Sequence, residues 1–553
     1  MKQFIFICGL FLLCLGFSPA AGAVVVKGVV YEDANGNKIK DRAEKGIPGV
    51  QVSDGEGIIL SSENGEYSFT LDIDKENRFV FISQPAGYKP TTPFYFRIDP
   101  ENRKEEYAVD FGLKEDPSSR NPDFKFLVVS DSQFVQQSEA DLLREEFKQI
   151  SETSGRPAFF FSVGDLTMSG TDEEFKMYLG AIEPFTIPVY HIFGGHDGNY
   201  GRMVPGTITP IKGGRGKIEH FEKWLGPAWY SWNYGNCHFI TYVSETGFLS
   251  ESQKKRQFIW IDKDISLQPE GINIIFATHD PSRPGGKLDE WSKKHKLPAI
   301  FYGHWHQRVI ANYKDIPLIL TAPIRGLDWG AFTRTYRVCS FKDGKLKTEM
   351  RVTGQYKRLV IVSPPPSGVI GRGNVPIHIL AYDTPTWIKK VEVRIEGEGI
   401  KTNLPLKNYG QWTWQDTLDT DKIKPGNYKI EVAASNDKGE TWSKEASFRL
   451  AGTNHPAPKP GGDWLFLLRN DKDMRNAEAE LAPPLSLSWV VPTGGMNMPY
   501  TSPIFYRGKV YTGIQNDEVN GKVYCPGAGV ACYDGKTGKE IWKTELNSSV
   551  RYG

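Results

Sequence analysis

Five short groups of polar residues carry the side chains in this sequence that could bind metal ions or move protons. Each group follows a run of apolar residues that predicts a buried strand. The groups are Ser130-Asp131-Ser132-Gln133, Gly164-Asp165, Gly194-Gly195-His196-Asp197, Thr278-His279-Asp280 and Gly303-His304-Trp305-His306. Because ligands bind at the carboxyl ends of strands in an open α/β sheet, we expect the groups to converge on one pocket. Imidazoles together with carboxylates suit Zn, Fe or Mn better than calcium.

The elements that must position these groups alternate between strands and helices from about 124 to 355. Buried strands are predicted over 124–130, 159–163, 189–193, 272–278 and 300–302, and Ser138 begins an amphipathic helix that ends at Ser151. The alternation predicts an α/β core for this part of the chain.

The order and spacing of the five groups resemble the calcineurin-like metallophosphoesterases, across roughly 124–355. The resemblance implies two metal ions that share the carboxylate of Asp165. The first ion would be held by Asp131, Gln133, Asp165 and His306, and the second by Asp165, the residue at 195, His279 and His304. It also implies that His196 is the non-ligand histidine, which contacts the phosphoryl oxygens or protonates the leaving group, with Asp197 orienting it.

Two positions depart from the pattern of that family. Gln133 stands where the first group usually ends in histidine, although a glutamine oxygen can still bind a hard metal. Gly195 stands where an asparagine normally binds the second ion, and glycine offers no side chain. Unless water, a backbone carbonyl or nearby Asn199 substitutes, the second ion should bind weakly. The cofactor is therefore one or two divalent ions of Mn, Fe or Zn.

The chemistry explains why these residue types are needed. Two cations about 3.5–4 Å apart stabilise the attacking and leaving oxygens of an in-line displacement on phosphorus and activate a water. We expect a secreted phosphoesterase acting on phosphomonoesters or phosphodiesters: small molecules, phosphorylated glycans or lipid head groups. Trp305, Trp329 and Asn199 are candidate substrate contacts. The alternative is a decayed phosphoesterase that binds partners through its other domains, and Gly195 motivates it.

The amino terminus predicts export. Residues 1–23 combine Lys2, an apolar run and the small residues Ala21-Gly22-Ala23, which is typical of a cleaved signal peptide. We therefore expect a periplasmic or extracellular protein without a transmembrane segment after cleavage. Lys and Arg number 67 against 66 Asp and Glu, so the sequence lacks the basic excess that binding to a nucleic-acid polymer requires.

All-β domains are predicted on both sides of the α/β core, giving a multidomain chain. Residues 24–113 predict a β-sandwich, 357–450 an immunoglobulin-like sandwich, and 463–553 one blade of a quinoprotein-like β-propeller, which suggests a fragment of a longer protein. Within the first domain, 33–44 has the spacing of a calcium loop and resembles bacterial surface B-type modules. Its candidate ligands are Asp33, Asn35, Asn37, Ile39, Asp41 and Glu44. Lys38 replaces the usual glycine, and a metal-free turn is the alternative.

Overall fold

The computed structural model describes residues 23–72, 78–200, 218–280, 287–306, 309–325, 334–409, 412–452, 503–514 and 529–546, with a few isolated positions between them. The signal-peptide residues 1–22, Trp329 and the segment 453–488 lie outside the described residues. The chain divides into two compact units. Met1–Ser83 and Lys89–Glu115 form the first, and Gln84–Tyr88 and Asp116–Gly553 form the second. Within the described ranges, no helix combines the length and apolar character needed to cross a bilayer.

The first unit is all-β. One sheet has the strand order β4-β1-β9-β6, with β8 also paired to β1, and the other has the order β3-β2-β5-β7. The strands are β1 (Ala23–Glu32), β2 (Gln51–Ser53), β3 (Ile58–Leu60), β4 (Glu66–Asp72), β5 (Phe79–Ile82), β6 (Tyr88–Pro90), β7 (Tyr95–Arg97), β8 (Glu106–Ala108) and β9 (Phe111–Glu115). Val24 and Val26 are buried at alternate positions of β1, as expected for a strand with one face on a core.

Two mixed sheets form the α/β part of the second unit. Their strand orders are β12-β11-β10-β19-β20 and β13-β14-β15-β16-β18-β17. The strands of the first are β10 (Phe124–Val129), β11 (Phe160–Ser162), β12 (Val189–His191), β19 (Thr335–Lys342) and β20 (Lys345–Val352). Those of the second are β13 (Tyr230–Tyr234), β14 (Cys237–Thr241), β15 (Asn273–Ala277), β16 (Lys296–Tyr302), β17 (Val309–Tyr313) and β18 (Ile316–Leu320). Within each sheet the strands that precede the polar groups run parallel, with β10–β12 in one and β15 and β16 in the other.

Aromatic rings join the two sheets into a sandwich. The ring of Phe126 on β10 lies 5.6 Å from that of Phe239 on β14 and 5.9 Å from that of Phe301 on β16, between ring centroids. Phe161 on β11 lies 5.5 Å from Phe301. These strands are buried on both faces, which explains why they appear in the sequence as continuous apolar runs.

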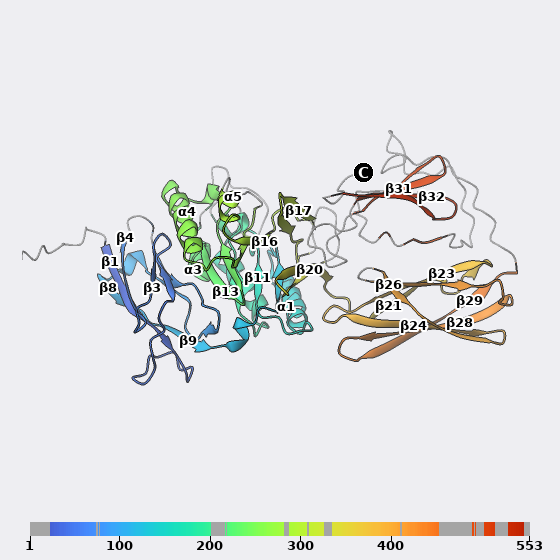
Figure 1. Cartoon of the computed structure of the whole chain (residues 1–553), viewed down its shortest axis with the longest axis horizontal. Coiled ribbons are helices and arrows are strands. Elements are labelled where there is room, and N and C mark those ends of the chain that lie inside the picture. The colour runs from blue at the N-terminus through green and yellow to red at the C-terminus, as the bar shows by residue number, and fades with distance from the viewer. Residues whose placement is uncertain are drawn as a thin grey trace, which may run out of the picture. The chain divides into compact units, whose positions relative to one another are not determined.

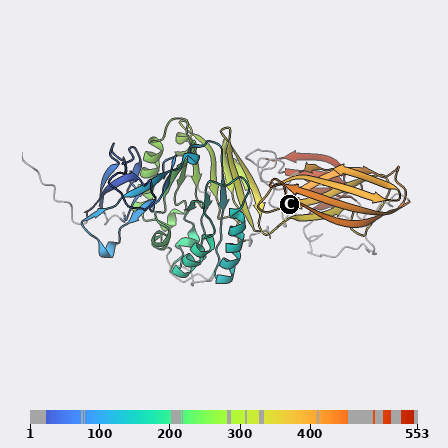
Figure 2. The same ribbon diagram turned by 90° about the horizontal axis from the view of Figure 1, so that it is seen from below.

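Helices connect the parallel strands and cover the outside of the sandwich (Figures 1 and 2). They are α1 (Gln137–Ser151), α2 (Asp172–Ile182), α3 (Glu219–Leu225), α4 (Glu251–Ser266) and α5 (Lys287–Trp291). Thr171 and Glu174 form a capping box that begins α2, and Ser250 and Gln253 form one at α4. α1 begins one residue before the predicted Ser138, and no side chain caps its amino end.

Two further β regions follow within the second unit. Residues 358–450 form sheets of order β21-β23-β27-β26 and β22-β29-β28-β24-β25 around one apolar core. Their strands are β21 (Arg358–Ser363), β22 (Val369–Ile370), β23 (Asn374–Tyr382), β24 (Ile388–Gly397), β25 (Ile400–Pro405), β26 (Lys407–Tyr409), β27 (Thr413–Asp419), β28 (Gly426–Asn436) and β29 (Thr441–Leu450). A four-stranded antiparallel sheet contains β30 (Ile504–Tyr506), β31 (Lys509–Ile514), β32 (Gly529–Asp534) and β33 (Glu540–Glu545). The immunoglobulin-like and propeller assignments stay predictions.

Candidate metal centre

The predicted ligands lie on loops that follow the parallel strands of the two sheets. Asp131 and Gln133 follow β10, Asp165 follows β11, and the short helix η4 (Gly195–Gly198) follows β12. His279 follows β15, while His304 and His306 follow β16. The backbone N–H of Asp131 donates to the carbonyl oxygen of Gly164, and that of Gly303 donates to the carbonyl oxygen of His279. The loops after neighbouring strands are therefore joined to one another.

Five predicted ligands share an uncommon backbone conformation, with positive φ. The residues are Asp131 (51°), Gln133 (33°), Asp165 (51°), His304 (69°) and His306 (51°). Left-handed conformations cost a non-glycine residue roughly 1–2 kcal/mol, and such strain gathers at functional sites. Its repetition at five positions indicates that the loops are shaped to aim these side chains rather than to minimise backbone energy.

The structure brings the side chains together in two clusters that share Asp165. Asp131, Asp165 and His306 form one, and Asp165, His279 and His304 form the other, with the ligand atoms of each cluster within 4.8 Å of one another. His306 Nε2 lies 3.2 Å from Asp131 Oδ1, and His279 Nε2 lies 3.0 Å from Asp165 Oδ2. These are the two groupings that the resemblance implies, with the same bridging carboxylate.

Buried polar atoms in the clusters fit the demands of divalent cations. Asp131 Oδ1 and His279 Nε2 are buried, and neither has a hydrogen-bond partner among the described residues. A buried polar group without a partner normally costs about 1–3 kcal/mol, and a cation would satisfy both. The opposite nitrogen of His279 lies 2.7 Å from the carbonyl oxygen of Val163. That hydrogen bond fixes the tautomer and leaves Nε2 as the ligand, a common arrangement at metal sites.

Charge is concentrated at the shared residue. Burial would raise the pKa of Asp165, but His279 and His196 hold it well below its ordinary value. Burial would also lower the pKa of His279, yet the carboxylates of Asp165, Asp131 and Glu245 hold it well above the usual range. Burial lowers the pKa of His304, and His279 adds to that effect. The ion-free pocket thus balances its carboxylates with a proton on His279, a charge that a bound metal ion would supply instead.

Comparison with known proteins agrees with this geometry. Residues 124–308 match the family model described as calcineurin-like phosphoesterase, and residues 33–116 match the model of its N-terminal domain. The chain carries a calcineurin-like phosphoesterase domain. GAP50, the anchor in the inner membrane complex of Plasmodium, is 15% identical, with 42% of this chain and 84% of that chain covered and a TM-score of 0.30. An archaeal phosphodiesterase is 13% identical, with 41% and 99% covered and a TM-score of 0.24. Scores this low carry no argument about fold or activity.

Curated relatives match a short stretch of the chain. Serine-aspartate repeat-containing protein D of Staphylococcus aureus strain Newman is 45% identical over 69 residues, which are 11% of this chain and 5% of that protein. Protein F of the same type, from Staphylococcus epidermidis, is 41% identical over 69 residues. The chain thus spans about one twentieth of the length of these relatives.

Gln133 lies inside the phosphoesterase site. Its side-chain nitrogen donates to Asp165 Oδ2 over 2.7 Å. Rotation of the amide by a half turn would present the oxygen in its place, which is the atom a metal needs. Arg325 donates to the backbone carbonyl oxygen of Gln133 over 2.6 Å, so the loop is held from outside the cluster.

The space beside Gly195 is filled by a residue that sequence reasoning missed. A Cβ placed on Gly195 would lie 2.8 Å from Oε2 and 2.9 Å from Cδ of Glu245. Burial raises the pKa of Glu245 to about 7, opposed by His279 and reinforced by Asp165 and Asp280. Asn199, the predicted substitute, instead directs its amide to Met168 and His196. Glu245 follows β14, a strand that we did not predict, and the apolar run 237–241 is the signal that could have revealed it.

The predicted partnership of His196 and Asp197 is wrong. The His196 ring is held by the carbonyl oxygen of Met168, 2.8 Å from Nδ1. Asp197 instead accepts hydrogen bonds from the backbone of Thr167 and Gly194, and burial with the nearby Asp165 raises its pKa well above the ordinary value. Asp197 therefore braces the loop, while the backbone N–H of His196 donates to Asp165 Oδ1 over 2.8 Å.

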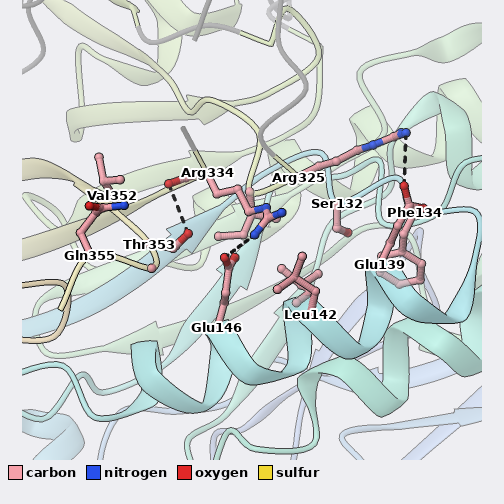
Figure 3. Close-up of a pocket in the computed structure, with 13 residues that line it drawn as sticks. Ser132, Phe134, Glu139, Leu142, Glu146, Arg325, Arg334, Val352, Thr353 and Gln355 are labelled. Atoms are coloured by element: carbon pink, nitrogen blue, oxygen red, sulfur yellow. Dashed lines mark hydrogen bonds and ion pairs between the residues drawn. The ribbon is translucent and has the colours of Figure 1, made fainter. Parts of the chain in front are cut away.

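The predicted substrate contacts fare differently. Trp305 is half exposed, between His304 and His306, whereas Trp329 lies outside the described residues. A cavity of about 630 Å³ lies beside Ser132 in the first ligand loop (Figure 3). Arg325 and Arg334 line it, and Arg334 is paired with Glu146 at 2.7 Å. Among the described residues that line this cavity there is no predicted metal ligand.

The predicted calcium loop of the first unit is closed by its own hydrogen bonds. Asp33 accepts from the backbone of Asn37 and Lys38, and Glu44 accepts from the backbone of Ala34 and Asp41. Lys38 has φ 66°, so it adopts the left-handed turn that glycine normally provides at this position. The loop has the expected conformation, and calcium binding stays a prediction.

Proposed function

We propose that the chain is an exported, metal-dependent phosphoesterase that hydrolyses phosphomonoesters or phosphodiesters. The observation that supports this best is the pair of carboxylate–histidine clusters joined at Asp165. Two divalent ions, when bound, would supply an activated water near neutral pH and stabilise charge on the phosphoryl oxygens. Asp131, Gln133, Asp165 and His306 would hold the first ion, and Asp165, His279 and His304 would contribute to holding the second.

The protein's own groups have separate tasks in this proposal. Asp165, low in pKa, keeps a negative charge between two sites that would otherwise repel each other. Met168 fixes Nδ1 of His196, which leaves Nε2 to contact a phosphoryl oxygen or to donate a proton to the leaving oxygen. Asp197 holds the backbone of that loop in place through Thr167 and Gly194.

The organic part of the substrate would contact side chains outside the metal clusters. The indole of Trp305 is exposed beside two ligand histidines and offers an aromatic face for stacking. A phosphorylated glycan, a lipid head group or another small ester would fit this description. We further propose that the signal-like leader directs export to the periplasm or beyond, and that the loop 33–44 holds a structural calcium ion.

The test begins with the metal content of the full chain, purified without chelators. We expect one or two equivalents of Mn, Fe or Zn, and turnover of p-nitrophenyl phosphate or its bis-ester. Asp165→Asn should lose both metal and turnover. Asp262→Asn is the matched control, because Asp262 pairs with Lys287 on the surface, 3.0 Å away, and it should keep both. A wild-type chain with neither metal nor turnover would favour the second candidate, a binding protein, which Gly195 motivates.

A further inference from the structure

The second cluster lacks one protein ligand by the reckoning of the sequence. Asp165, His279 and His304 supply three, and Gly195 supplies no side chain. The gap is not empty space, because the Glu245 carboxylate occupies the volume that a side chain at 195 would enter. Glu245 reaches this point from the opposite sheet, since it follows β14 whereas Gly195 follows β12.

The Glu245 carboxylate is oriented toward the cluster. Oε1 lies 3.9 Å from Nδ1 of His304. Oε2 is buried and has no hydrogen-bond partner among the described residues, as is true of Nε2 of the fully buried His279 in the same cluster. Two orphaned lone-pair atoms on neighbouring side chains are costly without a cation, and a metal ion would satisfy both.

We propose that Glu245 replaces the missing side chain at position 195 as the fourth protein ligand of the second metal ion, beside Asp165, His279 and His304. The inference rests on the proposed function, because it assigns a residue to the same metal centre. It means that Gly195 and Glu245 form a compensating pair, with a ligand moved from one loop to another. A carboxylate in place of an amide also adds one negative charge, which strengthens the attraction for a hard divalent ion.

A purely structural role for Glu245 makes a different prediction. The backbone N–H of Gly195 donates to Glu245, so the carboxylate could serve only to brace that loop. In that case its removal would lower stability and leave the number and affinity of bound ions unchanged. Metal stoichiometry therefore separates the two roles where activity alone would not.

The experiment compares four full-length proteins: wild type, Glu245→Ala, Gly195→Asn and the double variant. Bound Mn²⁺ is counted by elemental analysis, and its affinity is measured by titration calorimetry. Wild type should bind two ions, and Glu245→Ala should bind the second at least ~100-fold more weakly. Gly195 lies outside the left-handed region, so asparagine is sterically limited there by Glu245 alone. Gly195→Asn should therefore lose the second ion, and the double variant should regain it to within about tenfold of wild type.

Controls keep the result interpretable. Glu146→Gln alters another buried glutamate, paired with Arg334, and should retain two ions. If Glu245→Ala does not fold, Glu245→Gln keeps the acceptor for Gly195, and its second ion should bind about tenfold more weakly. A second ion held equally well by wild type and Glu245 variants overturns the assignment of Glu245 and leaves the phosphoesterase proposal standing. So does a wild type that binds one ion, whereas a wild type that binds none overturns both.

Discussion

Gly164→Ala tests the geometry of the metal centre without removing any ligand. Gly164 immediately precedes the bridging Asp165 and has φ 91°. A Cβ at this position would lie 2.6 Å from Nδ1 and 2.8 Å from Cγ of His279. The His279 ring is fully buried and hydrogen-bonded to Val163, so it cannot move aside without leaving its position as a ligand.

The expected loss of stability has two parts. An alanine with positive φ costs about 1–2 kcal/mol, and overlap with a buried side chain costs about 1–3 kcal/mol more. Together they predict that the free energy of unfolding falls by about 2–5 kcal/mol. Displacement of His279 should also weaken binding of the second ion by about 10–100-fold, the usual effect of disturbing the support of a ligand.

The matched control is Gly271→Ala. Gly271 has φ 80°, but a Cβ there would meet nothing within 4 Å. This variant carries the backbone strain without the clash, so we expect a loss of about 1–2 kcal/mol and normal metal binding. Urea denaturation of both variants in chelator, with Mn²⁺ titration of the folded proteins, measures the two effects. Equal destabilisation of the two variants together with equal metal affinity would refute the reasoning.

Three further predictions concern other parts of the structure. Gly303→Ala should weaken binding of the first ion, because a Cβ there would lie 2.7 Å from Asp131 Oδ2; unchanged Mn²⁺ affinity in calorimetry would contradict this. Burial lowers the pKa of His191 to about 4, so its contribution to stability is complete above pH 6.5 and is lost as the pH falls toward 4, by up to about 3 kcal/mol. His191→Gln should therefore lose less stability in urea between pH 7.5 and 4.5 than wild type does, and an equal loss would count against the burial argument. Saturating calcium should stabilise the first unit by about 2–3 kcal/mol in wild type but not in Glu44→Gln, and identical melting curves with calcium and with chelator would rule out the ion.

The sequence alone determined which residues could bind metal and where along the chain they lie. Apolar runs located the strands that precede Asp131, Asp165 and His279, and the structure confirms strands there as β10, β11 and β15. These assignments succeed because a strand buried on both faces must be apolar throughout, and because the carboxyl ends of parallel strands are where side chains can converge.

The tertiary structure decided which side chains meet. His196 and Asp197 are neighbours in sequence, yet the backbone of η4 turns Asp197 toward Thr167 and Gly194 while Met168 holds His196. Glu245 and Gly195 are 50 residues apart and come together only because two sheets pack face to face through their aromatic core. Local patterns record the burial and conformation of a segment, but the space that a missing side chain leaves is defined by atoms from the opposite sheet.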